Sequence, residues 1–109
     1  MSTKPTEIVF FLTVLRSEDL RVQYETWVRD VDTPLALALD GVESYRVVRL
    51  SEAAVMDGVA VPSLSYLEII EVSDLAAYQK AIAAAPASFF EQFDSFIKTY
   101  QAVSGVVIN

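Results

Sequence analysis

The residues of this chain that could do chemistry are carboxylates, tyrosines and arginines. Its 109 residues contain no histidine and no cysteine. Those absences remove the commonest general base, thiolate nucleophiles, disulfides and zinc–thiolate sites. The sequence also has no glycine-rich phosphate loop and no nucleophile elbow. Any reaction must therefore use acids, phenols, guanidinium groups or the substrate itself, and we expect neither a metal nor a cofactor.

Asp32 is the most informative carboxylate. It stands just before Pro34, where a helix should end and a new one should begin. One interpretation is an N-cap, worth about 1 kcal/mol, in which the carboxylate accepts bonds from the amides that follow. The other is a base or hydrogen-bond acceptor at a cavity. The two are only partly compatible, because a carboxylate that accepts several amides becomes a weak base.

Glu68 lies in the apolar stretch SYLEIIEV, where an unpaired buried charge is costly. A cross-strand pair with Arg46 or Arg49 would satisfy it. Alternatively, burial raises its pKa and fits it for proton transfer near neutral pH. The sequence leaves both interpretations open.

Alternate residues of a strand share a face, so Tyr66 accompanies Glu68. By the same rule Tyr45 accompanies Arg49. If the two pairs share one sheet face, they offer an acid, a base and a cation to a single ligand. The candidate catalytic residues are therefore Asp32, Glu68, Tyr66, Arg49 and Tyr45.

Three aromatic residues, Tyr24, Trp27 and Tyr78, are candidate substrate contacts. Tyr24 and Tyr78 occupy like positions in two similar stretches, LTVLRSEDLRVQYETW and LEIIEVSDLAAYQKAI. As hydrophobic core they would carry no function. As a cavity lining they suit a flat aromatic ligand through offset stacking.

The elements that position these residues follow from the apolar pattern. Short runs rich in Val, Ile and Phe predict strands, and apolar residues at helical spacing predict helices. Asp57-Gly58 is a two-residue hairpin signal. The predicted strands cover residues 7–15, 43–50, 64–72 and 102–108; the predicted helices begin after Ser17 and cover 34–39, 74–85 and 88–100.

This order, βαββαβ with two similar halves, predicts a single α+β domain over residues 1–109 with the ferredoxin-like plan. Right-handed crossovers place the helices on one face of a four-stranded antiparallel sheet. Yet the first strand has no polar face, since Ile8 and Phe10 point one way and Val9 and Phe11 the other. We therefore expect a homodimer joined through the sheet faces; the alternative is an unusually apolar exposed face.

The loop from residue 51 to residue 63 has several interpretations. Its small residues suit a flap over the cavity, an arm that reaches a partner subunit, or an ordinary long hairpin.

The net charge of the whole chain limits its partners. At −7, it argues against binding to nucleic acid. No apolar run reaches the roughly 20 residues of a membrane helix, and MSTKPTE has no apolar signal core. We expect a cytoplasmic protein that binds neither nucleic acid nor membrane.

The run YETWVRDVDTPLALALDGVESYRVVR, followed by PSLSYLEIIEVSDL, resembles the RedY-like (HapK-like) family of the dimeric α/β-barrel superfamily. The resemblance spans nearly the whole chain. It implies a homodimeric barrel with a cavity between each sheet and its helices, and the handling of a small aromatic metabolite in pyrrole or indole pigment pathways. The positions that carry it are Tyr24, Trp27, Asp32, Pro34, Val42, Tyr45, Arg49, Tyr66 and Glu68.

A weaker resemblance links the same stretch to the EthD-like branch of the superfamily. Where that branch usually has a histidine, this chain has Asp32, so the activity is not transferred. Two function classes remain: a cofactor-free enzyme for a condensation, cyclisation or related tailoring step, and a non-catalytic dimeric module that binds a metabolite or is structural.

Overall fold

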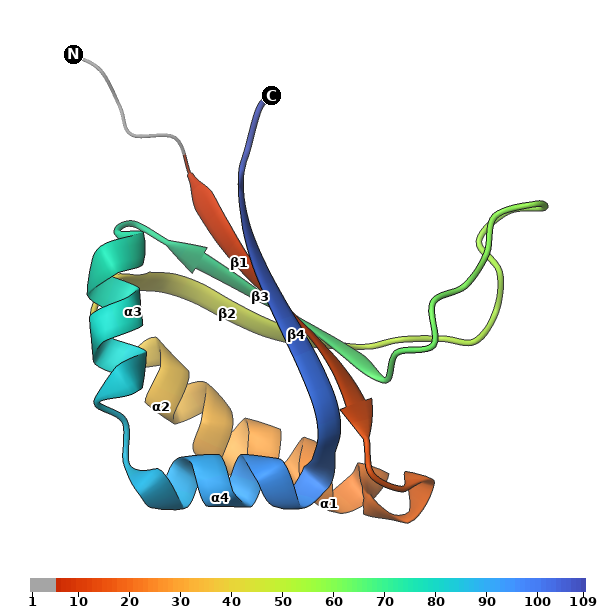
Figure 1. The fold of residues 1–109 in the computed structure, drawn as a ribbon, viewed down its shortest axis with the longest axis horizontal. Helices are drawn as coiled ribbons and strands as arrows, with labels where there is room; N and C mark the ends of the chain where they lie inside the picture. Colours follow the sequence, from red (N-terminus) through yellow and green to blue (C-terminus); the bar gives the residue numbers. More distant parts are fainter. Residues whose placement is uncertain (1–5) are drawn as a thin grey trace.

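The computed structural model describes residues 6–109, in which the strands follow the predicted order. Helices join the first strand to the second and the third to the fourth. The strands form one antiparallel sheet in the order β2-β3-β1-β4 (Figure 1). They are β1 (Glu7–Leu15), β2 (Val42–Arg49), β3 (Tyr66–Val72) and β4 (Ile97–Val106). The predicted α+β, ferredoxin-like fold is confirmed.

The helical segment after β1 runs through Pro34 without a break. It comprises η1 (Glu18–Leu20), α1 (Arg21–Trp27), the π-helical turn η2 (Val28–Asp32) and α2 (Thr33–Leu37). The prediction that Pro34 ends the first helix is wrong. In η2 the Thr33 amide donates to the Val28 carbonyl five residues back. This wider turn accommodates a ring that has no N–H and would otherwise crowd the preceding turn.

The second helical segment consists of α3 (Leu75–Ala83) and α4 (Ala87–Phe96), separated at Pro86, which lies between the two predicted helices. The Asp74 carboxylate caps α3 by accepting from the Ala77 amide at 3.1 Å. The predicted helix over 88–100 is too long, because Ile97 begins β4 and residues 97–100 pair with β1. Strand pairing overrides the helical spacing of the apolar residues there.

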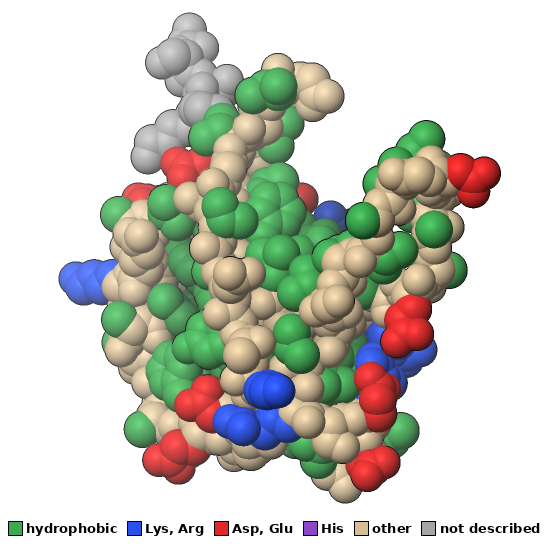
Figure 2. All heavy atoms as spheres, turned by 45° about the vertical axis from the view of Figure 1, so that its right-hand side comes forward, with side chains coloured by type: hydrophobic (Ala, Val, Ile, Leu, Met, Phe, Trp, Pro, Cys, Tyr) green, Lys and Arg blue, Asp and Glu red, His purple; other side chains and the backbone are tan. Residues whose placement is uncertain are grey.

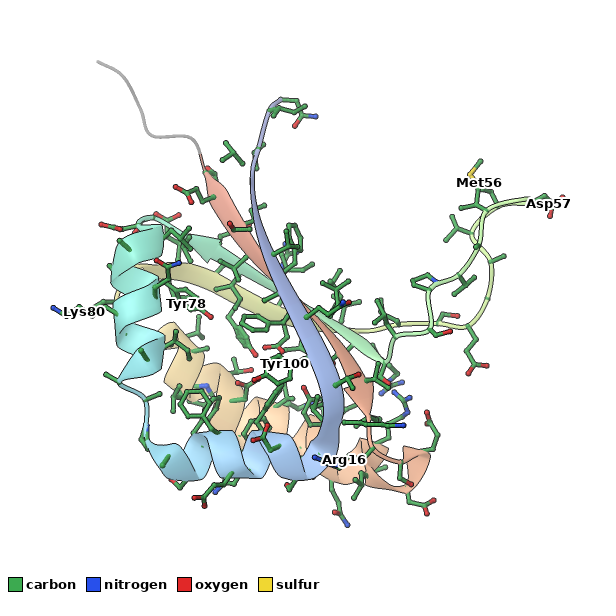
Figure 3. All side chains as sticks on the ribbon, viewed as in Figure 1. Arg16, Met56, Asp57, Tyr78, Lys80 and Tyr100 are labelled. Atoms are coloured by element: carbon green, nitrogen blue, oxygen red, sulfur yellow. The ribbon has the colours of Figure 1, made fainter. Side chains whose placement is uncertain are left out.

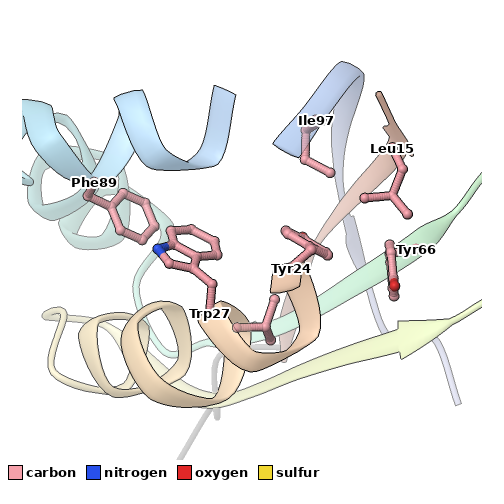
Figure 4. Close-up of a cluster of buried hydrophobic side chains, with 7 residues drawn as sticks. Leu15, Tyr24, Trp27, Tyr66, Phe89 and Ile97 are labelled. Atoms are coloured by element: carbon pink, nitrogen blue, oxygen red, sulfur yellow. The ribbon is translucent and has the colours of Figure 1, made fainter. Parts of the chain in front are cut away.

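The core lies between the helices and one face of the sheet (Figure 1). Figure 4 shows its aromatic part, in which Trp27 stacks on Phe89 with ring centroids 5.3 Å apart. Trp27 Nε1 also donates to Gln92 Oε1 at 2.6 Å, which ties α1 to α4. Tyr24 is fully buried beside it, 4.9 Å from the Tyr66 ring.

The opposite, open face of the sheet carries no helix among the described residues (Figure 1). Its cross-strand rows are largely apolar, with Arg46, Glu71 and Gln101 among the polar exceptions. One row joins Ile69, Phe10 and Val103, and another joins Leu67 and Leu12. Val103 is 57% exposed. Figure 2 shows apolar side chains gathered between the C-terminal end of β4 and the β2–β3 loop.

That loop forms an exposed arm, which we define as residues 51–63. Asp57 and Gly58 do form a turn, in which the Val59 amide donates to the Met56 carbonyl at 3.3 Å. The arm joins β2 to β3, which pair antiparallel with Arg49 opposite Tyr66, so the interpretation as the loop of a long hairpin holds, although no paired strands flank the turn within the arm itself. Figure 3 shows Met56 and Asp57 at the tip, far from the helices.

Candidate functional site

Three predicted residues come together at the centre of the helix-covered face. Asp32 ends η2, Tyr45 lies on β2 and Glu68 on the neighbouring β3. They are only 5%, 8% and 7% exposed, respectively. The Tyr45 hydroxyl stands between the two acids, hydrogen-bonded to Asp32 Oδ2 and 2.6 Å from Glu68 Oε1.

We call the side chains of Asp32, Tyr45 and Glu68 the acid row. The number of protons in this row decides its protonation state. The Tyr45 hydroxyl has one hydrogen and can donate to only one acid. The second short oxygen–oxygen contact therefore needs a proton from a carboxyl group, which donates to the Tyr45 oxygen. Asp32 and Glu68 thus hold one proton between them, like other carboxyl pairs that share a buried site.

Burial identifies Glu68 as the acid that keeps the proton. Loss of water, followed by the Asp32 charge, raises the pKa of Glu68 to about 8. Burial raises the pKa of Asp32 to about 6, against the hydrogen bond from Tyr45. Burial and both acids raise the pKa of Tyr45 far above its usual range, so it stays a phenol. Near neutral pH the row carries one negative charge, on Asp32.

The row faces a cavity of about 130 Å³ between the sheet and the helices. Apart from the three polar groups, its walls are aliphatic and aromatic, and none of the described lining residues is Lys or Arg. Tyr100 is 54% exposed at one side, and Tyr78 reaches in from α3 (Figure 3). The lining residues are Phe11, Asp32, Leu35, Ala36, Leu39, Tyr45, Glu68, Ile70, Tyr78, Ile82, Phe89, Phe90, Phe93 and Tyr100.

The predicted substrate contacts divide between cavity and core. Tyr78 lines the cavity, whereas Tyr24 and Trp27 do not. These two pack into the aromatic core, which is the alternative that the sequence left open for them (Figure 4). The Tyr24 hydroxyl has no hydrogen-bond partner in the described part of the chain.

The two other candidates, Arg49 and Tyr66, belong to a separate network around Glu25. Arg49 Nε donates to Glu25 Oε2 at 2.7 Å, and the Tyr66 hydroxyl donates to the same oxygen at 2.7 Å. Tyr66 accepts in turn from Arg21 Nη1 at 3.0 Å. Arg49 and Tyr66 line a second cavity of about 200 Å³, together with Glu25, Val28, Arg29, Thr33 and Val47.

The structure also corrects two interpretations of the acids. The Asp32 side chain makes no capping bond to α2, so the N-cap interpretation is wrong. Glu68 pairs with neither of its expected partners, since Arg46 lies 4.0 Å from Glu71 and Arg49 binds Glu25. The two predicted pairs do share the helix-covered face of the sheet, but Arg49 lines the second cavity and not the first, so acid, base and cation do not meet in one cavity.

Some of the cavity wall was missed by sequence reasoning. The phenylalanines of α4 were not among the candidate site residues, and Tyr100 was expected in a helix, yet Phe89, Phe93 and Tyr100 line the cavity. The i, i+4 spacing of Phe89 and Phe93 shows that they share a helix face, but not that a hollow lies beneath. The sequence pattern gave no indication that Glu25 would belong to a network, because its stretch of helix looks exposed.

Within residues 6–109, no group of three or more potential metal-ligating side chains comes close enough to hold an ion. None of the helices in this range has the length and apolar character that a bilayer crossing requires.

The fold and the buried acid row define the class: a small ferredoxin-like α+β protein with an apolar cavity between sheet and helices. Within that class, the chain belongs to the family of the REDY-like protein HapK, whose family model matches residues 7–108. The predicted RedY-like membership is confirmed. No functionally curated protein sequence matches the chain.

Three solved structures share the fold. HapK from Hahella chejuensis is 21% identical, with a TM-score of 0.75 over 94% of this chain and 92% of that one. SnoaB, a cofactor-independent oxygenase from Streptomyces nogalater, is 12% identical, with a TM-score of 0.70 over 97% and 96%. A dimeric protein of unknown function from Bacteroides fragilis is 12% identical, with a TM-score of 0.60 over 97% and 100%.

Proposed function

We propose that the chain binds a small aromatic metabolite with a ring N–H, of pyrrole or indole type, and moves protons on it. The observation that carries the proposal is the pair of buried acids joined by Tyr45 at the wall of an aromatic cavity. Asp32 is left with a negative charge that no described cation of the cavity balances. Such a site favours a neutral hydrogen-bond donor or a cation and disfavours an aromatic acid.

The size of the cavity supports a small ligand. Pockets for drug-sized molecules span about 300–1,000 Å³. At about 130 Å³, this cavity suits one small ring system. The edge-to-face pair of Phe93 and Tyr100, 5.3 Å apart, provides the aromatic surface against which such a ring would pack.

In the proposed mechanism, Asp32 accepts a proton from the bound ring system or from an adjacent carbon. Glu68 supplies a proton to the atom that gains electron density, and Tyr45 relays between them through its two hydrogen bonds. One acid poised above neutral pH beside one ionised acid is the arrangement that general acid–base catalysis needs. This chemistry suits a condensation or tailoring step in secondary metabolism. The family of HapK and the fold shared with SnoaB support that setting.

The second candidate is a non-catalytic binding module. It is favoured by the fact that Tyr45 already satisfies both acids, so that the row is complete without a ligand. In that case Asp32, Tyr45 and Glu68 only give the cavity a negative charge. A bound metabolite would then leave the cavity chemically unchanged.

Titration calorimetry with indole and its oxygen isostere benzofuran tests the proposal. We expect indole to bind at least 10-fold more tightly than benzofuran, and indole-3-carboxylate not to bind. Asp32→Asn should remove the preference for indole with little change in melting temperature, since Asn still accepts from Tyr45. Absence of indole binding at millimolar concentration contradicts the proposal.

Glu68→Gln separates the two candidates. It keeps the shape and the bond to Tyr45 but cannot deliver a proton. Once a turned-over metabolite is in hand, an enzyme loses turnover in this variant while retaining affinity. Unchanged turnover in both Glu68→Gln and Asp32→Asn rules out acid–base catalysis by this row.

We also propose a homodimer in which the open faces of two sheets pack together. The apolar rows of that face and the described dimer from Bacteroides fragilis support it. Light scattering at micromolar concentration should give twice the chain mass of 12.1 kDa. A value equal to one chain mass contradicts it.

A further inference from the structure

The arm, residues 51–63, presents apolar side chains that no described residue of its own chain covers. Val55 is 96% exposed, Met56 62%, Val59 54% and Val61 37%. The arm contains only two charged residues, Glu52 and Asp57. Aliphatic side chains clustered in this way on a projecting segment mark a surface that another molecule covers.

The arm does not close over its own cavities. None of its residues lines either of the two cavities of the helix-covered face. It leaves the sheet at the end of β2 and returns at the start of β3, where the Leu50 amide donates to the Ser65 carbonyl at 3.0 Å. From that base it extends away from the helices (Figure 1). The interpretation as a flap over its own cavity therefore has no support in the geometry.

The arm is instead continuous with the open face of the sheet. Val48, at the end of β2 that leads into the arm, lies beside Leu67 in an open-face row. The C-terminal end of β4 rises on the other side of the same hollow (Figure 2), with Val107 and Ile108 exposed. Arm, open face and strand end thus form one apolar concavity. In its cross-strand rows the charged Arg46 and Glu71 lie 4.0 Å apart and offset each other.

We propose that the arm docks on a second copy of this chain and clasps the subunit whose open face packs on its own. The proposal rests on the sheet-to-sheet dimer. In a two-fold interface each patch meets its own copy, so each arm reaches the other subunit and both are buried together. A second copy offers the largely aliphatic surface that Val55, Met56 and Val59 require.

The absence of cysteine allows a direct test of where the arm lies. A spin label on Met56→Cys is mixed with isotope-labelled, label-free chains, so that only contacts between subunits broaden the observed signals. We expect broadening of open-face and β4 residues of the partner, such as Val103. The control is a label on Lys80→Cys, which points outward from α3 (Figure 3) and should leave those signals sharp.

A second measurement tests the energetic role of the arm. The triple variant Val55→Ser, Met56→Ser and Val59→Ser should raise the dimer dissociation constant at least about 10-fold. The matched control, Asp57→Ser in the same turn, should leave the constant within about twofold. Both variants should keep the wild-type fold by circular dichroism, because the arm residues changed pack on no described part of their own chain.

The outcomes separate this inference from the dimer it rests on. A wild-type monomer overturns both. A dimer with no broadening between subunits, or with an unchanged constant in the triple variant, overturns the arm contact and leaves the sheet-to-sheet dimer standing.

Discussion

Two glutamates of this protein, Glu25 and Glu68, each bind a tyrosine hydroxyl, yet their acidities move in opposite directions. Glu25 meets Tyr66 at 2.7 Å and Glu68 meets Tyr45 at 2.6 Å. The pKa of Glu25 falls to about 2, mainly through its hydrogen bond to Arg49. The pKa of Glu68 rises to about 8, mainly through burial.

The difference shows that contact with a tyrosine hydroxyl does not determine whether the pKa of a glutamate rises or falls. Glu25 keeps some contact with water and faces guanidinium groups, which stabilise its charge. Glu68 lies deeper, with a second acid as the nearest charge and no arginine. The network around Glu25 fixes α1 to β2 and β3. The acid pair at Glu68 holds a proton that is available near neutral pH. Chemistry is therefore expected at Glu68, although Glu25 has the more elaborate network.

The largest expected effect is on the pH dependence of stability. The folded-state pKa of Glu68 lies above its ordinary value of 4.5, so its contribution to the free energy of unfolding is full below pH 4.5 and is lost as pH rises through 8. At about 1.4 kcal/mol per pKa unit, the loss is up to roughly 5 kcal/mol. Denaturation of wild type and Glu68→Gln across this range measures it, and the variant should lack the decline between pH 6 and pH 8, because Asp32, with a pKa of about 6, accounts only for the part below.

Glu25 should show the mirror image. Its folded-state pKa lies below 4.5, so its contribution is full above pH 4.5 and is lost as pH falls towards 2. Glu25→Gln should flatten the acid side of the curve and leave the neutral side unchanged. If the two variants flatten the same side, the contrast between the glutamates is wrong.

The two tyrosines provide a second comparison. Tyr45→Phe removes the group that satisfies two buried acids and should lower the free energy of unfolding by about 2 kcal/mol at pH 7. Tyr66→Phe should cost less than about 1 kcal/mol. The reason is that Arg21 retains its bond to Glu18 and Glu25 retains its bond to Arg49. Urea unfolding measures both. An equal or larger loss for Tyr66→Phe would show that the Tyr45 row is not the tighter one.

The fold was predictable because its signals are local and repeated. Apolar strands, the Asp74 cap and Pro86 each determine an element without help from distant residues. The π-helical turn η2 was not predictable in the same way, because helical backbone can absorb Pro34 by widening one turn. The end of α4 was missed because pairing with β1, far away in sequence, decides where Ile97 lies.

The candidate site was predictable in its residue types but not in its partnerships. A mid-strand Glu68 and a residue such as Asp32 before a proline stand out in the sequence, and the structure brings them to one tyrosine. The pairing of arginines with acids depends on side chains from three elements, α1, β2 and β3. The resulting assignment, Arg49 to Glu25 rather than to Glu68, follows only from the packing of α1 against the end of β2.

The smallest expected effect comes from the arginine partner. Arg49→Gln should raise the pKa of Glu25 towards its ordinary value with little loss of stability, since Arg49 is exposed and Tyr66 and Arg29 remain. The pKa of Glu68 should not change. A shift of Glu68 in this variant would mean that the two networks are coupled, contrary to their separation in the structure.

The most direct test of the central claim is a pH titration followed by carbon NMR of the side-chain carboxyl groups. The account predicts that Glu68 titrates near pH 8 and Asp32 near pH 6, while Glu25 stays ionised down to about pH 2. In Tyr45→Phe the Asp32 midpoint should rise, because its hydrogen bond is lost. A Glu68 midpoint at or below 4.5 would show that the acids hold no shared proton at neutral pH and would contradict the account.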